Sequence, residues 1–122
     1  MALVVVAEDD EDVREWMCQV LRRAGHEVLD VPDGQAALNL MWQRTPDVAV
    51  LDVDMPRMDG LDLRAAIGAD PYLHNVPVVF ATGKLAHADQ RIQGVDDDVL
   101  VKPFSKEVLL AHVDSALQKD RT

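Results

Sequence analysis

Short apolar runs separated by amphipathic segments dominate the pattern of this chain. Five such runs, rich in Val and Leu, recur along it: Leu3 to Ala7, Glu27 to Val31, Val48 to Asp52, Val76 to Thr82 and Val99 to Val101. They are too short for core helices, and their β-branched residues favour strands. Most are apolar throughout, which is typical of strands buried on both faces of a parallel sheet. We therefore predict five strands in a parallel sheet that is covered by helices on both sides.

Helical periodicity separates the predicted strands. It is clearest in the first segment, where six apolar residues fall on one helix face: Val13, Trp16, Met17, Val20, Leu21 and Ala24. Gly25 ends this helix. Four further helices are predicted, after Asp33-Gly34, over Leu61 to Ala69, around Ala86 to Gln93, and after Ser105 as N-cap. The segment around Ala86 to Gln93 is the most weakly patterned.

Strand and helix thus alternate five times, and right-handed crossover connections turn such a chain into a doubly wound α/β fold. The expected strand order is 2-1-3-4-5, the flavodoxin-like order. A length of 122 residues, 48% of them hydrophobic, fits one compact domain over residues 1–122. In such sheets the functional crevice lies beyond the carboxyl ends of the strands, where the strand order reverses.

Charge and cysteine content narrow the class of protein. The formal net charge is −10, so direct binding to nucleic acid or to an anionic membrane is not expected. The apolar N-terminus runs straight into Glu8-Asp9-Asp10, which argues against a membrane span or a signal peptide. Cys18 is the single cysteine, so no internal disulfide can form and a cytoplasmic location is expected. Trp16 and Trp42 are predicted to pack in or just beneath the core.

Acidic residues are expected at two neighbouring strand ends. The first strand is followed by Glu8 and Asp9, and the third ends in Asp52. Like charges this close are unfavourable unless a cation or a proton intervenes. Oxygen ligands and partial exposure suit Mg²⁺, whereas a nucleotide site would place a glycine-rich turn here. Glu11 and Asp12 are interpreted as first-turn residues of the following helix.

A hydroxyl and an amine follow at the ends of the last two strands. Thr82 ends the fourth strand, and the fifth leads into Lys102-Pro103. A carboxylate nucleophile, a metal ion, a hydroxyl and an ammonium can together hold a phosphoryl group in transit. The strand ends therefore indicate phosphoryl chemistry.

Four motifs in sequence order now carry a family resemblance: Glu8-Asp9, Leu51 to Pro56 with Met58-Asp59-Gly60, Ala81-Thr82-Gly83, and Lys102-Pro103-Phe104. Over essentially its whole length the chain resembles the receiver domain of two-component response regulators, the CheY-like fold. The resemblance implies that Asp52 is the phosphoacceptor. It implies that Asp9 binds Mg²⁺ directly, Glu8 through water, and Asp54 through its backbone carbonyl. Thr82 and Lys102 would contact the phosphoryl oxygens, and the Lys102–Pro103 peptide would be cis.

The resemblance also implies a role. A receiver takes a phosphoryl group from a sensor histidine kinase or a histidine phosphotransfer protein. It relays the signal by conformational change to a downstream effector protein or a fused output domain. Such a domain is not an enzyme in the usual sense, and only self-directed phosphoryl transfer and autodephosphorylation are expected. Val99 departs from the family, because many members carry an aromatic residue at this position that turns inward on phosphorylation.

Two alternatives remain open on the sequence. Asp52-Val53-Asp54 resembles the nucleophile and acid of an aspartyl-phosphate hydrolase of the haloacid dehalogenase type, although such enzymes carry this pair on their first strand and add a cap. The other alternative is a pseudo-receiver, a binding module with this fold that is not phosphorylated. It would be expected to lack part of the set found here at the strand ends.

Overall fold

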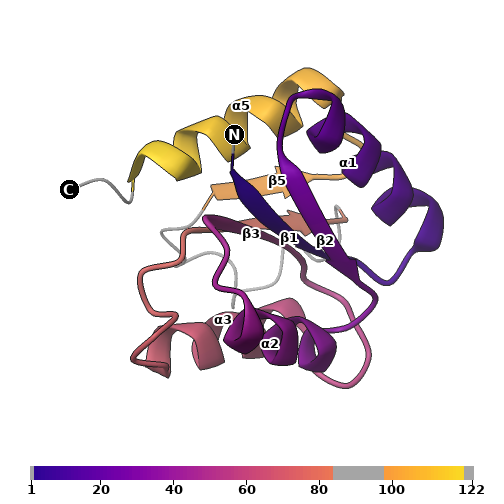
Figure 1. Ribbon diagram of the computed structural model, residues 1–122. Helices are drawn as coiled ribbons and strands as arrows, with labels where there is room; N and C mark the ends of the chain where they lie inside the picture. Colours follow the sequence, from indigo (N-terminus) through magenta and orange to yellow (C-terminus); the bar gives the residue numbers. More distant parts are fainter. Residues whose placement is uncertain (1, 84–97, 120–122) are drawn as a thin grey trace.

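A five-stranded parallel sheet forms the centre of the computed structural model, which describes residues 2–83 and 98–119 (Figure 1). The strands are β1 (Leu3–Ala7), β2 (Glu27–Val31), β3 (Val48–Asp52), β4 (Val78–Thr82) and β5 (Asp98–Val101). Their order is β2-β1-β3-β4-β5, and each neighbouring pair is parallel. The predicted order 2-1-3-4-5 is confirmed.

Four helices accompany the sheet in the described residues: α1 (Glu11–Arg23), α2 (Gly34–Gln43), α3 (Gly60–Ala69) and α5 (Lys106–Lys119). Each helix is preceded by an N-cap residue whose side chain accepts a hydrogen bond from a backbone N–H of the first turn. In chain order these residues are Asp10, Asp33, Asp59 and Ser105. The helix predicted around Ala86 to Gln93 lies outside the described residues. Gly25, with φ +97°, turns the chain from α1 into β2, as predicted.

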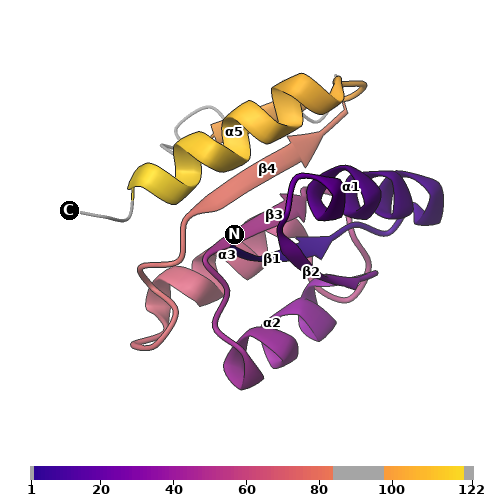
Figure 2. The same ribbon diagram turned by 45° about the horizontal axis from the view of Figure 1, so that its top comes forward.

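The helices cover the sheet in two layers. Figures 1 and 2 show α1 and α5 on one face and α2 and α3 on the other. Successive residues of β1 serve the two layers alternately, because Val4 and Val6 pack with α1 and α5, whereas Val5 and Ala7 pack with α2 and α3. The continuous apolar pattern of this strand is therefore explained by burial on both faces.

The strand predicted from Val76 begins two residues later, at Val78. Pro77 has no N–H to give to a β-ladder, although its carbonyl accepts a hydrogen bond from Ala49 N at 3.0 Å. The prediction that Trp42 is packed was wrong, because its side chain is 56% exposed and its indole Nε1 donates to Asp70 Oδ2 at 2.6 Å. Trp16 is 37% exposed and lies against Phe104, with ring centroids 5.8 Å apart.

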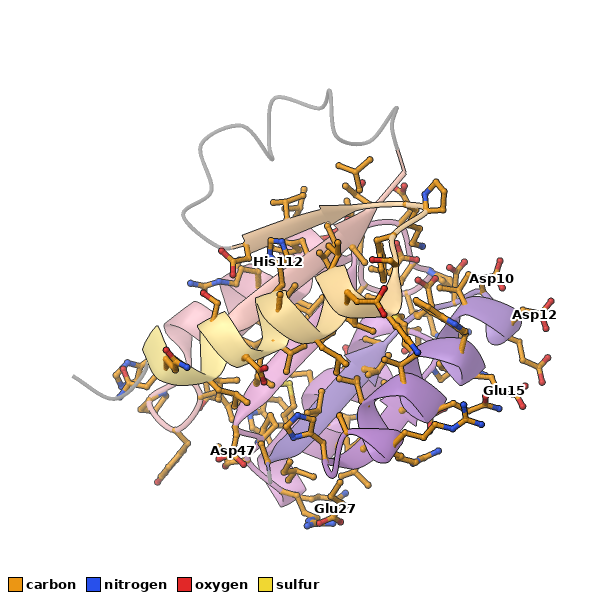
Figure 3. The ribbon with its side chains drawn as sticks, turned by 90° about the horizontal axis from the view of Figure 1, so that it is seen from above. Asp10, Asp12, Glu15, Glu27, Asp47 and His112 are labelled. Atoms are coloured by element: carbon orange, nitrogen blue, oxygen red, sulfur yellow. The ribbon has the colours of Figure 1, made fainter. Side chains whose placement is uncertain are left out.

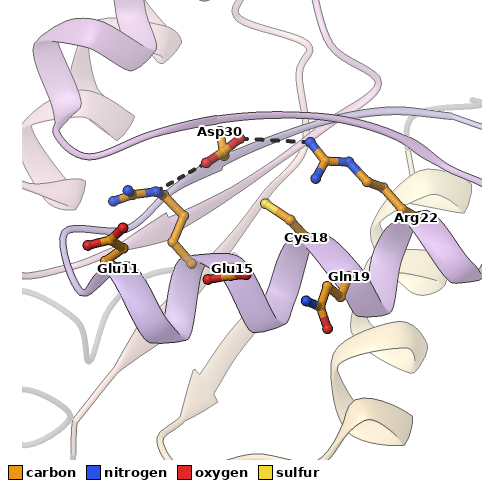
Figure 4. Close-up of a pocket in the computed structure, with 7 residues that line it drawn as sticks. Glu11, Glu15, Cys18, Gln19, Arg22 and Asp30 are labelled. Carbon is orange, nitrogen blue, oxygen red and sulfur yellow. Dashed lines mark hydrogen bonds and ion pairs between the residues drawn. The ribbon is translucent and has the colours of Figure 1, made fainter.

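One edge of the sheet, formed by β2, is lined by arginines. Arg22 Nη2 donates to the carbonyl of Val28 at 3.0 Å. Asp30 lies between Arg14, at 3.1 Å, and Arg22, at 3.8 Å. Figure 4 shows the Asp30 carboxylate and Arg22 facing each other above α1. These groups line a groove of about 290 Å³ between α1 and β2, with Cys18 beneath it. Burial raises the pKa of the Cys18 thiol to about 11.

Hydropathy over the described helices identifies none that is long and apolar enough to cross a membrane.

Candidate functional site

The carboxyl ends of β1 and β3 bring three acidic side chains together. Asp52 is the last residue of β3 and is buried, and Glu8 directly follows β1 with no exposed surface. Asp9, the next residue, is exposed. Each offers one carboxylate oxygen, and these oxygens all lie within 4.8 Å of one another. The strands β1 and β3 are neighbours although β2 lies between them in sequence, so the reversal of strand order places this cluster.

Lys102 reaches this cluster from the end of β5. Its Nζ lies 2.7 Å from Glu8 Oε1 and 3.4 Å from Asp52 Oδ1. The Lys102 side chain is 25% exposed, so the ammonium is partly withdrawn from water and the ion pairs are only weakly screened. The peptide between Lys102 and Pro103 is cis, as the resemblance implied.

The electrostatics of the cluster are dominated by burial and like charge. Burial, followed by the neighbouring Glu8 carboxylate, raises the pKa of Asp52 to about 8, although the nearby Lys102 ammonium lowers it. Burial alone would lower the pKa of Lys102, but the Glu8 and Asp52 carboxylates hold it above its ordinary value. The Lys102 ammonium therefore stays charged. Unless further positive charge is brought to the site, Asp52 tends to stay protonated.

Thr82 and Asp54 flank the acidic cluster. Thr82, fully buried at the end of β4, directs its hydroxyl to the carbonyl of Gly83 at 3.3 Å. It adjoins Lys102 through the backbone, since Lys102 N donates to Thr82 O at 2.7 Å. Asp54 is exposed, and its backbone N–H donates to Asp52 Oδ1 at 3.3 Å. The structure thus joins Glu8, Asp9, Asp52 and Lys102 directly, with Thr82 and Asp54 at the margin.

The donor set fits a hard divalent cation. Three carboxylates converge on one point, no nitrogen or sulfur ligand is among them, and one of the three faces solvent. Two of these carboxylates are buried and mutually repulsive, so a cation would relieve an unfavourable interaction. Glu8, Asp9 and Asp52 can therefore hold a metal ion that prefers oxygen ligands.

Polarity changes abruptly beside the site. An apolar hollow of about 190 Å³ adjoins Lys102 and is lined by Val13, Trp16, Lys102, Pro103 and Phe104. Acidic residues gather at the start of α1, where Asp10 and Asp12 lie, with Glu15 further along the helix, as Figure 3 shows. The apolar hollow, through Lys102, and the acidic start of α1, through Asp10, thus both adjoin residues of the site.

One contact near the site was missed by sequence reasoning. Arg57, in the loop after β3, forms an ion pair with Asp33 at the start of α2. An acid directly before a helix indicates an N-cap, but no local signal tells which distant arginine it meets.

Comparison with known proteins agrees with these features. The profile of the response regulator receiver domain matches residues 4–114. The transcriptional regulatory protein YrkP of Bacillus subtilis is 36% identical over 119 residues, which cover 95% of this chain and 49% of YrkP. The transcriptional regulatory protein PrrA of Mycobacterium tuberculosis is also 36% identical, with coverage of 95% and 50%. The chain spans about half the length of the curated relatives it matches.

Solved structures show the same architecture. The signal receiver domain of a signal transduction histidine kinase from Syntrophus aciditrophicus superposes with a TM-score of 0.88 at 28% identity, covering 100% of this chain and 95% of that one. The receiver domain of the Francisella response regulator 1452 gives 0.84 at 26% identity, with coverage of 99% and 100%. The matched profile, the relatives and the sheet order lead to one conclusion: this chain belongs to the response regulator receiver domain family.

Proposed function

We propose that Asp52 accepts a phosphoryl group and that Mg²⁺ is required for the transfer. The observation that supports this most directly is the meeting of Glu8, Asp9, Asp52 and Lys102 at the ends of neighbouring strands. The ion would be held by Glu8, Asp9 and Asp52, with the backbone carbonyl of Asp54 as a further ligand. When bound, it would supply positive charge that neutralises the carboxylates and the phosphoryl oxygens.

The chemical step is an in-line displacement. A carboxylate oxygen of Asp52 forms a bond to phosphorus while the bond from phosphorus to the donor's leaving atom breaks, which yields an acyl phosphate. The leaving group keeps the electron pair of the broken bond and takes a proton. Lys102 would neutralise one phosphoryl oxygen, and the Thr82 hydroxyl, which now donates to Gly83 O, would turn to donate to another.

The donor is proposed to be a phosphohistidine of a sensor histidine kinase or a histidine phosphotransfer protein. The apolar hollow beside Lys102 offers such a partner a surface within reach of Asp52. Output would pass to a downstream effector protein or a fused output domain, consistent with relatives named as transcriptional regulators of about twice this length. Slow hydrolysis of the acyl phosphate by the domain itself would end the signal.

Two further properties belong to the proposal. Residues 1–122 form a single receiver domain, which the one continuous sheet supports. A cytoplasmic location fits the free, buried thiol of Cys18.

Phosphorylation can be tested with a small donor. The protein is incubated with acetyl phosphate, with and without Mg²⁺, and its intact mass is measured. We expect a gain of one phosphoryl group that requires Mg²⁺, is lost in Asp52→Asn, and persists in the matched control Asp54→Asn. An unlabelled wild type would instead support a pseudo-receiver, and label retained in Asp52→Asn would place the acceptor elsewhere.

A further inference from the structure

The loop over residues 53–59, directly after Asp52, contains a strained turn. Arg57 has φ +66°, the left-handed region that side chains other than glycine rarely adopt. Met58 N donates to Pro56 O at 2.7 Å, which closes a three-residue turn around Arg57. Turns of this kind with positive φ are uncommon and strained. Such a conformation persists only where surrounding contacts enforce it.

Two contacts hold this loop against the start of α2. The Arg57 guanidinium lies on Asp33 Oδ2, with Nε at 3.0 Å and Nη2 at 2.8 Å. The backbone N–H of Gly34 donates to Met58 O at 3.1 Å. The approach is close enough that a Cβ on Gly34 would lie 2.2 Å from Met58 O. The loop and the N-terminus of α2 are therefore in direct backbone contact, with the ion pair beside it.

Asp33 is built into this contact. Its side chain is 7% exposed, and its second oxygen, Oδ1, accepts from Ala36 N at 2.8 Å as the N-cap of α2. The Ala36 N–H, together with the Arg57 guanidinium, keeps the pKa of Asp33 below its ordinary value despite burial. One carboxylate thus begins a helix and binds the loop at the same time.

The other parts of the loop are joined to the acceptor. Asp54 N donates to Asp52 Oδ1 at 3.3 Å, and Gly60 N donates to Val53 O at 2.9 Å. A displacement of the turn at Arg57 would therefore be felt three residues earlier, at Asp54, whose carbonyl is a proposed metal ligand.

We propose that Arg57 and Asp33 are positioning residues for the metal and phosphoacceptor site, because their ion pair fixes the loop that places Asp54 beside Asp52. The inference rests on the proposed function. It gives the ion pair between Arg57 and Asp33, which lies outside the carboxylate cluster, a role in the affinity for the metal ion.

Two substitutions separate this role from simple structural effects. Arg57→Gly removes the guanidinium but accommodates positive φ without strain. Asp33→Asn removes the charge but keeps a side-chain oxygen that can cap α2. The exposed ion pair between Arg44, at the end of α2, and Glu27, at the start of β2, provides matched controls. Arg44→Gln changes the net charge as Arg57→Gly does, and Glu27→Gln changes it as Asp33→Asn does.

The measurement is the dissociation constant for Mg²⁺ by calorimetry, with the melting temperature of the metal-free protein recorded in parallel. We expect Arg57→Gly and Asp33→Asn each to weaken Mg²⁺ binding by about tenfold, as the loss of a partner that orients a ligand does. The double variant should bind about as weakly as either single variant, because both disrupt the same contact. Labelling by acetyl phosphate at saturating Mg²⁺ should slow less than at limiting Mg²⁺.

The two substitutions change the net charge in opposite directions. Long-range electrostatics alone would make Arg57→Gly bind Mg²⁺ more tightly and Asp33→Asn more weakly, as the two control variants should do to a small extent. That pattern would overturn the proposal, as would a lower melting temperature with an unchanged dissociation constant. A wild type that binds no Mg²⁺ would remove the proposed function and this inference together.

Discussion

Glu8 is a carboxylate with no exposed surface, placed where a strand of the sheet ends. Its burial is tolerated because the Lys102 ammonium lies 2.7 Å from Oε1 and the Asp10 backbone N–H donates to Oε2 at 3.2 Å. The same ammonium is 3.4 Å from Asp52 Oδ1. The single positive charge of Lys102 is thus shared by two buried carboxylates. The effect of substituting Asp52 or Lys102 on the stability of the fold follows from this sharing.

Asp52→Asn should stabilise the metal-free protein, and the gain should grow with pH. The pKa of Asp52 is raised to about 8 in the folded protein, whereas the pKa of an aspartate in the unfolded chain is about 4. Between these values the folded wild type binds a proton that the unfolded chain does not, so the stability due to this group falls as pH rises. Asparagine does not titrate. Thermal unfolding should show a gain on the order of 1 kcal/mol, about 4 °C, at about pH 8.5 and little gain at about pH 5.

The control for that experiment is Asp54→Asn, which removes an exposed carboxylate two residues away. It should change the melting temperature little at either pH. A gain in Asp52→Asn that is equal at both pH values, or larger at the lower one, would contradict a raised pKa at Asp52.

Lys102→Met should destabilise the metal-free protein while preserving most of the apolar stem of the side chain. It leaves Glu8 buried beside Asp52 without their shared ammonium, and because the lysine is partly exposed we expect a loss of about 1–3 kcal/mol. Mg²⁺ should raise the melting temperature of this variant more than that of wild type, since the ion replaces the missing positive charge. Lys106→Met, at the exposed start of α5, is the control and should resemble wild type. An equal response to Mg²⁺ in Lys102→Met and wild type would contradict this account.

At the scale of elements, the connections are as constrained as the strands. Gly34 begins α2 so close to the loop after β3 that no side chain fits there. Gly68, in contrast, is exposed in the last turn of α3, and a Cβ added to it would meet only the far end of the flexible Arg64 side chain, at 3.0 Å. Gly34→Ala should therefore cost about 2 kcal/mol or more through displacement of the Met58 carbonyl. Gly68→Ala should instead stabilise by about 0.5–1 kcal/mol, through helix propensity and a less flexible unfolded chain.

Chemical denaturation of the two glycine variants tests this contrast, because both make the same substitution in a helix. Equal effects on the denaturation midpoint would show that the contact between α2 and the loop is not tight. The wild-type slope should be retained in both variants, since neither changes the surface exposed on unfolding.

The elements themselves could be predicted well, because their signals are local. β1, β2 and β3 have the bounds that their apolar runs predict, and the caps Asp33 and Ser105 fall where a short polar residue precedes an amphipathic run. The start of β4 was displaced by Pro77, and Trp42 was misjudged because an indole can be satisfied by the distant Asp70 while its ring stays exposed.

The site could be anticipated because its residues end strands, and parallel topology alone brings strand ends together. Glu8, Asp9 and Asp52 lie together as predicted. The ion pairs of Lys102 with Glu8 and Asp52, and that of Arg57 with Asp33, depend on side-chain packing between distant segments. No periodicity carries that information.

Across the whole domain, the sheet separates two hydrophobic cores, one beneath α1 and α5 and the other beneath α2 and α3. Val99 lies on the side of α2 and α3, next to Phe80 in the register of β4 and β5. It is short and stiff at χ1, so it cannot occupy the inward and outward positions of an aromatic ring. We expect the phosphorylated state to be transmitted without a side-chain rotation at this position.

Methyl and backbone NMR with and without a beryllofluoride mimic of the phosphoryl group tests this expectation. Thr82 and Gly83 should show large shifts, because the hydroxyl leaves the Gly83 carbonyl, whereas Val99 should keep its rotamer. The Asp52→Asn variant is the control and should show none of these changes. Large changes confined to Val99 and α5, with Thr82 and Gly83 unmoved, would defeat the proposal.

The arginines along the outer edge of β2 bear on whether another strand can pair with this edge. An open strand edge offers unpaired backbone groups to any extended chain and is a common start of aggregation. Here the outward carbonyl of Val28 is already taken by Arg22, and Asp30 is fixed between Arg14 and Arg22. An incoming strand would have to displace these charged side chains before it could pair. These side chains therefore oppose the addition of a further strand at β2, so this edge of the sheet is a poor template for growth into a larger assembly.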